Sequence, residues 1–404
     1  MKFVTEFIVF LIIFGFPASI NADLFSKILK KAALDNGILP PHQLYDDRDS
    51  KLAKLGKVFF ESENISLNRK ISCKACHLNE FGSADGIPIA VGIGGKGKGH
   101  ERALGEGKFI PRNTLPLWGI GGHGFNTYFW DGKVDFSNGS KISQFGNDAP
   151  SSDSLVVAIH LPAIEIGEML VDDSMIKQHK KETTKDALAV YKLIAEKVRE
   201  HEEGAVSELA KTIGKKTAEI QFIDIARSIA AFIRSEFRIK NTKFHKFLFE
   251  NGDLTDEELR GGLIFFGKGK CSICHKGSYF TDFEFHSIPF PQLGFGKNGF
   301  GIDYGRFNVT FEPKDLYKFR TPPLFNVAKT APYGHSGSAA TLNEAITHHF
   351  DPLKFVKINE MNELERHEYY KRLAISSQSI LYISYLTEDE VKLLVKFLET
   401  LSFD

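Results

Sequence analysis

The sequence is poor in several features that often indicate what a protein does. Lys and Arg total 51 and Asp and Glu total 51 in 404 residues, so no strong basic field argues for a nucleic-acid partner. After the apolar run at residues 7–16, no segment is apolar enough to cross a bilayer. Tryptophan occurs only twice, at Trp118 and Trp130. Cysteine is also scarce, with four residues in the whole chain, and their positions are informative.

All four cysteines lie in two copies of the motif Cys-x-x-Cys-His. The copies consist of Cys73, Cys76 and His77, and of Cys271, Cys274 and His275. Two thiols about one helical turn apart can form thioether bonds to the vinyl groups of one haem, and the adjacent imidazole can ligate its iron. A structural zinc site, two disulfides or a thioredoxin-like redox pair would also use four cysteines, but none needs a histidine after both pairs. The motifs therefore predict two covalently bound haems c.

The N-terminus predicts export from the cytoplasm. Lys2 precedes the apolar run, and small residues follow it up to Ala22, so residues 1–22 have the pattern of a signal peptide. Glu6 weakens the positive end of this pattern, and an uncleaved membrane anchor is the alternative. A mostly polar lead-in over residues 30–50 is expected to follow. Because bacteria attach covalent haem outside the cytoplasm, the signal and the haem motifs both favour a periplasmic protein.

Similar segments surround the two haem motifs. Residues 52–60 and 259–266 precede them, share a Gly-x-x-Phe-Phe pattern, and are expected to be short helices. A capping box that starts at Thr255 supports the second helix. Residues 112–117 and 320–326 follow the motifs and are also related. These parallels predict an internal duplication, with one haem in each copy.

Between the two copies the sequence predicts a helical connector. Apolar residues recur on one helix face over residues 186–201 and 217–238, and a capping box at Thr387 begins a last helix. We therefore expect a mainly α fold of two c-type cytochrome domains with long loops, each domain enclosing one covalent haem. The N-terminal, peroxide-facing domain with the connector would span residues 23–248, and the C-terminal, electron-transfer domain would span residues 249–404.

Three further short stretches, in their order along the chain, are typical of one protein family. They are Phe-Trp-Asp-Gly at residues 129–132, Glu168 with Met169, and Thr-Ala-Pro-Tyr-x-His-Ser-Gly at residues 330–337. With both haem motifs in place, residues 52–401 resemble the bacterial di-haem cytochrome c peroxidase family. That family includes the enzyme that matures the tryptophylquinone of methylamine dehydrogenase. The resemblance implies that the N-terminal haem meets peroxide and that the C-terminal haem stores electrons and passes them on.

The resemblance also implies roles for single residues. Trp130 would be an electron bridge between the haems, and Glu168 would be the acid/base group beside the first haem. The apolar neighbours of Glu168 favour a carboxyl group held in a pocket. The family's inter-domain calcium positions fall on Asn113, Thr330 and Pro332, and its haem-propionate contact falls on His335. A core tryptophan, a solvated glutamate and ordinary turn residues are the structural alternatives.

Two positions depart from the family pattern. The loop over residues 92–107 has Ile93 where the typical peroxidase has a removable histidine, and an apolar side chain cannot ligate iron. His100 lies in the same loop, where a solvated histidine is the simpler interpretation. Ala158 stands in the place of the family's glutamine. We expect the first haem to have an open site without reductive activation.

A third difference concerns the second haem. An ungapped count from His335 places His349 at the family's methionine or tyrosine position, with His348 beside it. Imidazole is a common haem ligand, so His275 and His349 are expected to ligate the second iron, while His77 ligates the first. Loss of thioether ligation would lower the potential of that haem. The absence of tyrosine favours peroxide reduction over oxidation of a protein.

These observations predict a periplasmic cytochrome c peroxidase. It would reduce hydrogen peroxide to water with electrons from a small cytochrome c or a cupredoxin, using two haems c and one calcium ion. A di-haem oxidase that acts on a partner protein is one alternative. A non-enzymatic electron carrier or redox sensor is another. A homodimer is left open, and no nucleic-acid partner is expected.

Overall fold

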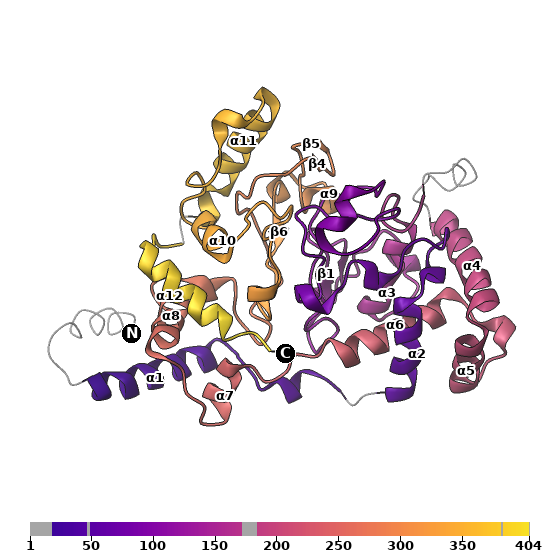
Figure 1. The fold of residues 1–404 in the computed structure, drawn as a ribbon, viewed down its shortest axis with the longest axis horizontal. Coiled ribbons are helices and arrows are strands. Elements are labelled where there is room, and N and C mark those ends of the chain that lie inside the picture. Colours follow the sequence, from indigo (N-terminus) through magenta and orange to yellow (C-terminus); the bar gives the residue numbers. More distant parts are fainter. Residues whose placement is uncertain (1–17, 47–48, 172–183, 381–382, 404) are drawn as a thin grey trace.

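The computed structural model describes residues 18–46, 49–171, 184–380 and 383–403, so residues 1–17 of the expected signal lie outside the described part. The described chain is mainly helical, with long loops and short two-residue strands (Figure 1). The α-helices are α1 Ala18–Asp35, α2 Ser50–Glu61, α3 Ser154–His160, α4 Thr184–His201, α5 Glu203–Ile213, α6 Phe222–Glu236, α7 Lys243–Phe249, α8 Asp256–Phe266, α9 Phe307–Thr310, α10 Leu342–His348, α11 Glu363–Ile380 and α12 Glu388–Glu399. Among these residues, no helix combines the length and the apolar character that a membrane span requires.

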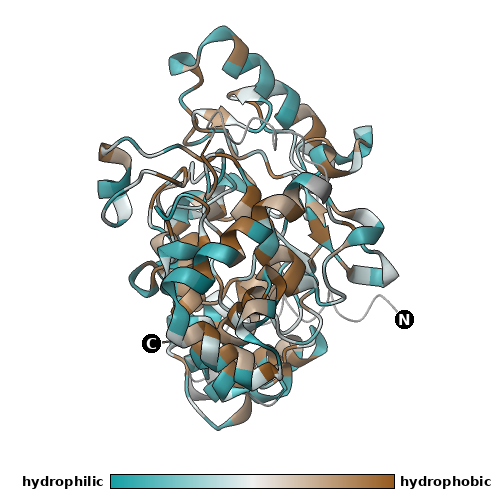
Figure 2. Ribbon diagram, turned by 90° about the vertical axis from the view of Figure 1, so that its right-hand side faces the viewer, coloured by the Kyte–Doolittle hydropathy of each residue, from teal (hydrophilic) through white to brown (hydrophobic). Residues whose placement is uncertain are grey.

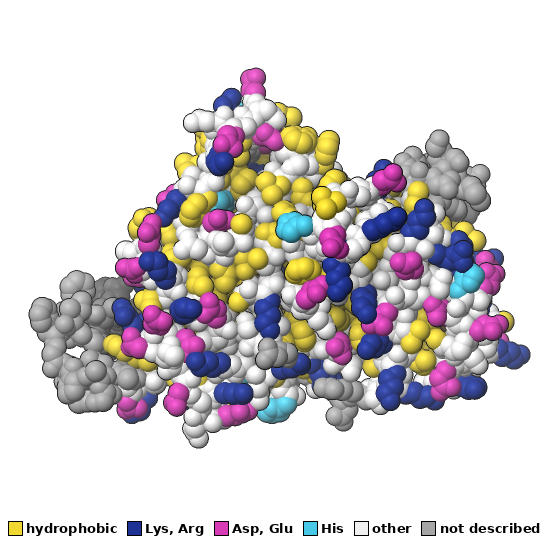
Figure 3. Space-filling view, viewed as in Figure 1, with side chains coloured by type: hydrophobic (Ala, Val, Ile, Leu, Met, Phe, Trp, Pro, Cys, Tyr) yellow, Lys and Arg dark blue, Asp and Glu magenta, His cyan; other side chains and the backbone are white. Residues whose placement is uncertain are grey.

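The strands form three small antiparallel pairs. These are β1 Thr127–Tyr128 with β2 Val134–Asp135, β3 Phe285–His286 with β6 Phe319–Arg320, and β4 Phe295–Gly296 with β5 Gly299–Phe300. The helices around them carry hydrophobic residues on one side and hydrophilic residues on the other, so their apolar faces can form a core (Figure 2). The face shown in Figure 3 mixes Lys and Arg with Asp and Glu, in keeping with the balanced composition.

The predicted helices are largely confirmed. The connector contains α4 and α6 where the apolar pattern predicted helices, and α5 lies between them. Thr255 and Thr387 each cap a helix, because their hydroxyl oxygens accept hydrogen bonds from the backbone of Glu258 and Glu390. The polar lead-in was wrong in part: α1 occupies residues 18–35 and buries Leu29 and Ala33. Lysines at positions 27, 30 and 31 gave this segment a polar appearance in the sequence.

A glycine contact joins the first and last helices of each copy. A side-chain carbon on Gly56 of α2 would lie 1.8 Å from the Ser228 carbonyl oxygen of α6. On Gly261 of α8 it would lie 2.0 Å from the Leu393 carbonyl oxygen of α12. Only glycine allows backbones to approach this closely. The contact supports the internal duplication. It makes Gly261 the equivalent of Gly56, whereas the shared Gly-x-x-Phe-Phe pattern had aligned Gly56 with Gly262, one residue later.

Replacing Gly56 with alanine is expected to destabilise the fold by about 1–3 kcal/mol, because the new methyl group must push α2 away from α6. Gly204 is the matched control. It lies in helix α5, is exposed and has open space around it, so Gly204→Ala should stabilise by up to about 1 kcal/mol. Denaturant unfolding of both variants measures the difference. Equal stability of Gly56→Ala and the unaltered protein would show that this helix contact is not close.

The N-terminal helix α1 packs against the second half of the chain. Helix α1 lies against α8, where Leu29 occupies the space beside Gly262 (Figure 1). Beyond the helix, the Asn36 carbonyl oxygen accepts a hydrogen bond from the Gly277 amide (2.9 Å), and Lys30 lies over the Phe247 ring. The structure therefore places residues 18–36 against elements of the C-terminal copy, while α2 begins the N-terminal copy.

Buried charges join the two halves near their centre. The Arg112 guanidinium donates to both carboxylate oxygens of Asp303 (2.8 and 2.9 Å) and to Asp131 (2.6 Å). Arg306 from the second half pairs with Asp135 from the first (3.0 Å). All of these side chains are buried, and a buried arginine is favourable only when its charge is fully paired. This network fixes β2 and the turn before it against the second half.

Candidate functional site

Both Cys-x-x-Cys-His motifs fold as tight turns. Short 3-10 turns span Cys73–Ala75 and Cys271–Ile273, and the amide of each following histidine donates to the first cysteine's carbonyl oxygen (3.2 and 2.9 Å). None of the four cysteines is in a disulfide. In the described part of the chain, no group of metal-binding side chains contains both pairs, which leaves no shared zinc site. Burial raises the pKa of Cys73 and Cys76 to about 12, whereas a reactive redox pair needs a lowered pKa.

The two motif histidines are held in the same way. The Nδ1–H of His77 donates to the Ser83 carbonyl oxygen, and that of His275 donates to the Phe280 carbonyl oxygen, both over 2.9 Å. Burial lowers the pKa of each imidazole to about 4, so both rings are neutral. With Nδ1 occupied, Nε2 presents its lone pair, which is the usual arrangement of a histidine that ligates a metal.

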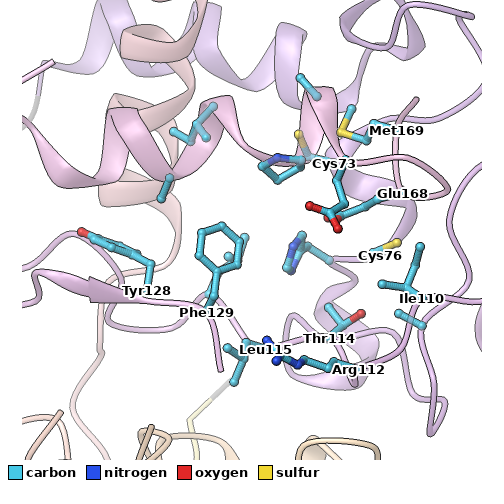
Figure 4. A pocket seen from close by; sticks show the side chains of 18 of the residues that line it. Cys73, Cys76, Ile110, Arg112, Thr114, Leu115, Tyr128, Phe129, Glu168 and Met169 are labelled. Atoms are coloured by element: carbon cyan, nitrogen blue, oxygen red, sulfur yellow. The ribbon is translucent and has the colours of Figure 1, made fainter. Parts of the chain in front are cut away.

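A pocket opens directly at the first motif. Its walls are mostly apolar and include Phe60, Ile65, Leu117, Leu155, Ala163, Met169 and Ile229, together with Cys73, Cys76 and His77 (Figure 4). Arg320 also lines this pocket and is buried, yet no described carboxylate pairs with its guanidinium, which donates to the Phe129 and Thr321 carbonyl oxygens. Apolar walls, two thiols, a free imidazole nitrogen and an unpaired buried cation fit a covalent haem with its propionates.

Glu168 enters the same pocket from the loop that follows the 3-10 turn Pro162–Ile164. In Figure 4 its carboxylate lies between Cys73 and Cys76. Gly92 makes this possible, because a side-chain carbon there would collide with the Gly167 carbonyl oxygen at 2.1 Å. Burial raises the pKa of Glu168 above its ordinary value. A carboxyl group with a raised pKa in a pocket is suited to both giving and accepting a proton.

The structure also locates the two departures from the family pattern. Ile93 is buried, and its amide donates to the Gly167 carbonyl oxygen (3.0 Å), so it belongs to the packing behind Glu168. His100 is exposed, as a solvated loop histidine would be. Ala158 lines the first pocket with its small side chain. The loop is braced by buried Arg102, whose guanidinium donates to the carbonyl oxygens of residues 91, 92 and 95.

Trp130 lies where the first pocket meets the second half. Its indole Nε1–H donates to the Asn113 carbonyl oxygen (2.9 Å), and its own carbonyl oxygen accepts from the Arg320 amide (2.8 Å). The side chain is half-buried and lines the first pocket. The side chain of Trp130 thus bonds within the first half and its backbone bonds to the second half, and its role as an electron bridge stays a prediction.

Two of the three residues expected at the calcium position are brought together. The side-chain amide of Asn113 donates to the Pro332 carbonyl oxygen (2.6 Å). The Thr330 hydroxyl donates to the Val327 carbonyl oxygen (3.2 Å). His335 is buried nearby, stacks on Phe319, and has Gln292 and Arg372 at its Nε2. Its carbonyl oxygen accepts from the Asn113 amide, which ties the same two halves together.

The second motif faces helix α10. His349, at the end of this helix, donates from Nδ1 to the Ala345 carbonyl oxygen (2.8 Å), so its Nε2 is free, as in the two motif histidines. It is near enough to His275 to lower the pKa of that imidazole further. His348 is oriented differently: it stacks on Phe290 (4.9 Å between ring centroids), and neither ring nitrogen has a hydrogen-bond partner. The geometry favours His349 over His348 as a ligand.

Comparison with known proteins agrees with this site. The family model for di-haem cytochrome c peroxidases matches residues 50–253, just over half of the chain. The chain belongs to this family. It is 27% identical to cytochrome c551 peroxidase of Pseudomonas aeruginosa over 76% of this chain and 75% of that protein. It is 24% identical to the methylamine utilization protein MauG of Methylorubrum extorquens over 81% of this chain and 78% of that protein.

Solved structures agree on the fold. The diheme peroxidase BthA of Burkholderia thailandensis superimposes with a TM-score of 0.63 at 20% identity, covering 91% of this chain and 89% of that chain. A MauG-like protein associated with microbial copper homeostasis gives 0.62 at 23% identity, covering 91% and 92%. Membership of this family implies two haem cofactors and makes the chain a haem oxidoreductase of the peroxidase and MauG type.

Sequence reasoning missed several charged residues of this family member. Lys133, Glu165 and Lys297 line the first pocket beside Glu168. Lys133 directly follows the Trp-Asp-Gly stretch and Glu165 precedes Glu168 by three residues, so their positions were a signal that we did not use. Lys297 gave no signal, because it comes from a distant segment of the second half.

Proposed function

We propose that this member of the family reduces hydrogen peroxide to water in the periplasm, with electrons from a small cytochrome c or a cupredoxin. The observation that carries the proposal is the Glu168 carboxyl group, which lines one pocket with His77, Cys73 and Cys76. Peroxide reduction needs an open iron site, a group that moves protons, and two electrons from outside. The residues of this pocket can serve the first two needs.

The haem that Cys73, Cys76 and His77 would hold supplies the redox chemistry when bound. Glu168 accepts a proton from hydrogen peroxide and returns it to the departing oxygen. Two further protons and two electrons convert both oxygens to water. Burial of the carboxyl group among apolar side chains limits its access to bulk water and raises its pKa above the ordinary value.

Electrons would reach this pocket from the second haem, held by Cys271, Cys274 and His275. Trp130 would serve as the bridge, and two observations support this: its side chain lines the first pocket, and its carbonyl oxygen accepts from the Arg320 amide of the second half. The proposal includes domain limits at residues 23–248 and 249–404, with α1 packed across this limit onto α8, and a haem-propionate contact for His335. It also includes one calcium ion held by the side-chain oxygen of Asn113 and the carbonyl oxygens of Thr330 and Pro332, for which a hard cation is suited.

The second candidate function is oxidation of a partner protein, which is supported by the similarity to MauG. His349, rather than a tyrosine, stands beside the second motif and favours the peroxidase. The test is to record optical spectra of the oxidised protein before and after peroxide, and then to follow oxidation of a reduced small cytochrome c. Peroxide-dependent turnover of the cytochrome supports the proposal. Two six-coordinate irons that are inert to peroxide would instead identify an electron carrier.

Replacing His349 with alanine should remove one low-spin bis-histidine signal from the electron paramagnetic resonance spectrum of the oxidised protein. The reason is that Nδ1 of His349 bonds to the Ala345 carbonyl oxygen, which leaves Nε2 as the ligand atom, and that His349 is close enough to His275 to lower its pKa. His348→Ala is the matched control and should leave that signal in place, since its ring stacks on Phe290. Loss of the signal only in His348→Ala would move the ligand by one residue. A methionine-to-iron charge-transfer band would exclude both.

A further inference from the structure

Four charged side chains meet at one wall of the first pocket. They are Lys133, Glu165, Glu168 and Lys297. Glu165 is paired twice, with the Lys133 ammonium at 3.3 Å and with the Lys297 ammonium at 3.1 Å, through different carboxylate oxygens. The side chains of Lys133, Glu165 and Lys297 are only 17%, 31% and 27% exposed, so water screens these pairs less than it would on an open surface.

The three elements that supply these charges are far apart in the sequence. Lys133 directly precedes β2, and both glutamates come from the loop after Pro162–Ile164. Lys297 lies in the turn between β4 and β5, in the second half of the chain. That hairpin is well supported, since Phe295 and Phe300 pack edge to face and Asn298 bonds to Asn308. Lys297, from the second half of the chain, therefore places a positive charge in the pocket beside the first Cys-x-x-Cys-His motif.

The two glutamates experience different surroundings. Lys133 and then Lys297 hold the pKa of Glu165 at about 2, so this carboxylate stays charged at any working pH. Glu168 forms no ion pair with a described residue, and burial raises its pKa. Around Glu168, the Lys133 and Lys297 charges favour its ionised form and the Glu165 charge opposes it. Arg112 and Arg320 line the same pocket, but Arg112 is already paired with Asp131 and Asp303.

We propose that Lys297 is a positioning residue of the peroxide site, which fixes Glu165 as a permanent charge next to Glu168 and thereby sets when Glu168 takes up a proton. The inference rests on the proposed role of Glu168. Two carboxyl groups in one pocket would then have separate tasks: Glu168 moves protons and Glu165 supplies a constant field. Since Lys297 belongs to the second half, the contact between the halves would tune proton transfer at the first haem site.

The test uses the oxidised two-haem protein and cyanide as the probe. Hydrogen cyanide must lose its proton when it binds ferric haem, so its association rate rises with pH as a nearby base becomes ionised. Lys297→Gln removes a positive charge that favours ionised Glu168, and the midpoint of the rate profile should move to higher pH. Glu165→Gln removes a negative charge, and the midpoint should move to lower pH. A shift of about one pH unit is expected for each.

Two control variants distinguish the positioning role of Lys297 from a general loosening of the β4–β5 hairpin. Lys297→Arg keeps the charge and should keep the profile of the unaltered protein. Asn308→Ala removes both hydrogen bonds to Asn298 and a long one to Asp303 (3.4 Å) without changing a charge, and should also leave the midpoint in place. Haem content and far-ultraviolet circular dichroism establish that each variant is folded.

Opposite shifts in Lys297→Gln and Glu165→Gln support the positioning role. Shifts in the same direction, or none, would overturn it. Opposite shifts in a protein that never turns over peroxide would leave the positioning role standing and refute the proposed function. Failure of the unaltered protein to bind cyanide would refute the open first site and this inference together.

Discussion

Replacing Glu168 with glutamine is expected to lower kcat/KM for hydrogen peroxide by about 10²–10⁴-fold. Glutamine keeps the size of the side chain but cannot accept the proton that peroxide must give up. Burial has raised the pKa of Glu168, so in the unaltered protein activity should rise as the pH rises through that value. This rise should disappear in Glu168→Gln. Steady-state oxidation of a reduced cytochrome c across the pH range measures both effects.

The matched control for this prediction is Glu106→Gln, an exposed glutamate on the loop that packs against Glu168. Its turnover should equal that of the unaltered protein, and both variants should keep two covalent haems. Unchanged turnover in Glu168→Gln would move the proton-transfer role elsewhere. His160 is then a poor replacement, because it is buried in α3 with its Nδ1 bonded to the Val156 carbonyl oxygen.

Replacing Cys271 and Cys274 together with alanine is expected to halve the covalent haem content, from two haems to one. The two thiols lie in one tight turn with His275, and the other two cysteines belong to the first motif. Without the thioether bonds the second haem cannot be retained through denaturation. Mass spectrometry of the denatured protein and the absorbance of the pyridine haemochrome measure the loss.

The same pair of substitutions at Cys73 and Cys76 should remove the other haem and leave the His275 site intact. The two variants should therefore have equal haem content but different spectra, because only one retains the His275 and His349 pair. Retention of two haems in either variant would contradict the attachment sites. A purified protein that contains zinc and lacks haem would contradict the whole interpretation.

The sequence was sufficient for the features that depend on neighbouring residues. The haem motifs, the capping boxes at Thr255 and Thr387, and the helices of the connector all follow from local spacing. The family follows from the order of several short stretches, and the match over residues 50–253 confirms it. The duplication was also visible, but its register was wrong by one residue, because helix packing selects Gly261 and not the glycine of the shared pattern.

Features that depend on contacts between distant segments were not predictable. A different limit applies to Ser83 and Phe280, which lie close in sequence to the motif histidines but orient them through backbone carbonyl groups that any residue could supply. Lys297 reaches the first pocket from a hairpin more than one hundred residues away from Glu165, and nothing in its own neighbourhood indicates that contact. Roles of single residues, such as those of Trp130 and Glu168, remain predictions that the experiments above test.

The docking of α1 on α8 has a consequence for how the chain reaches its native state. A helix near the start of the chain finds its partner only after residues beyond Asp256 have been synthesised. Contacts of such long sequence separation form slowly, because a large loop must close first. The C-terminal copy should therefore be completed last. Fragments that begin at residue 249 should expose the apolar surface around Gly262 that Leu29 covers in the full chain, and aggregate.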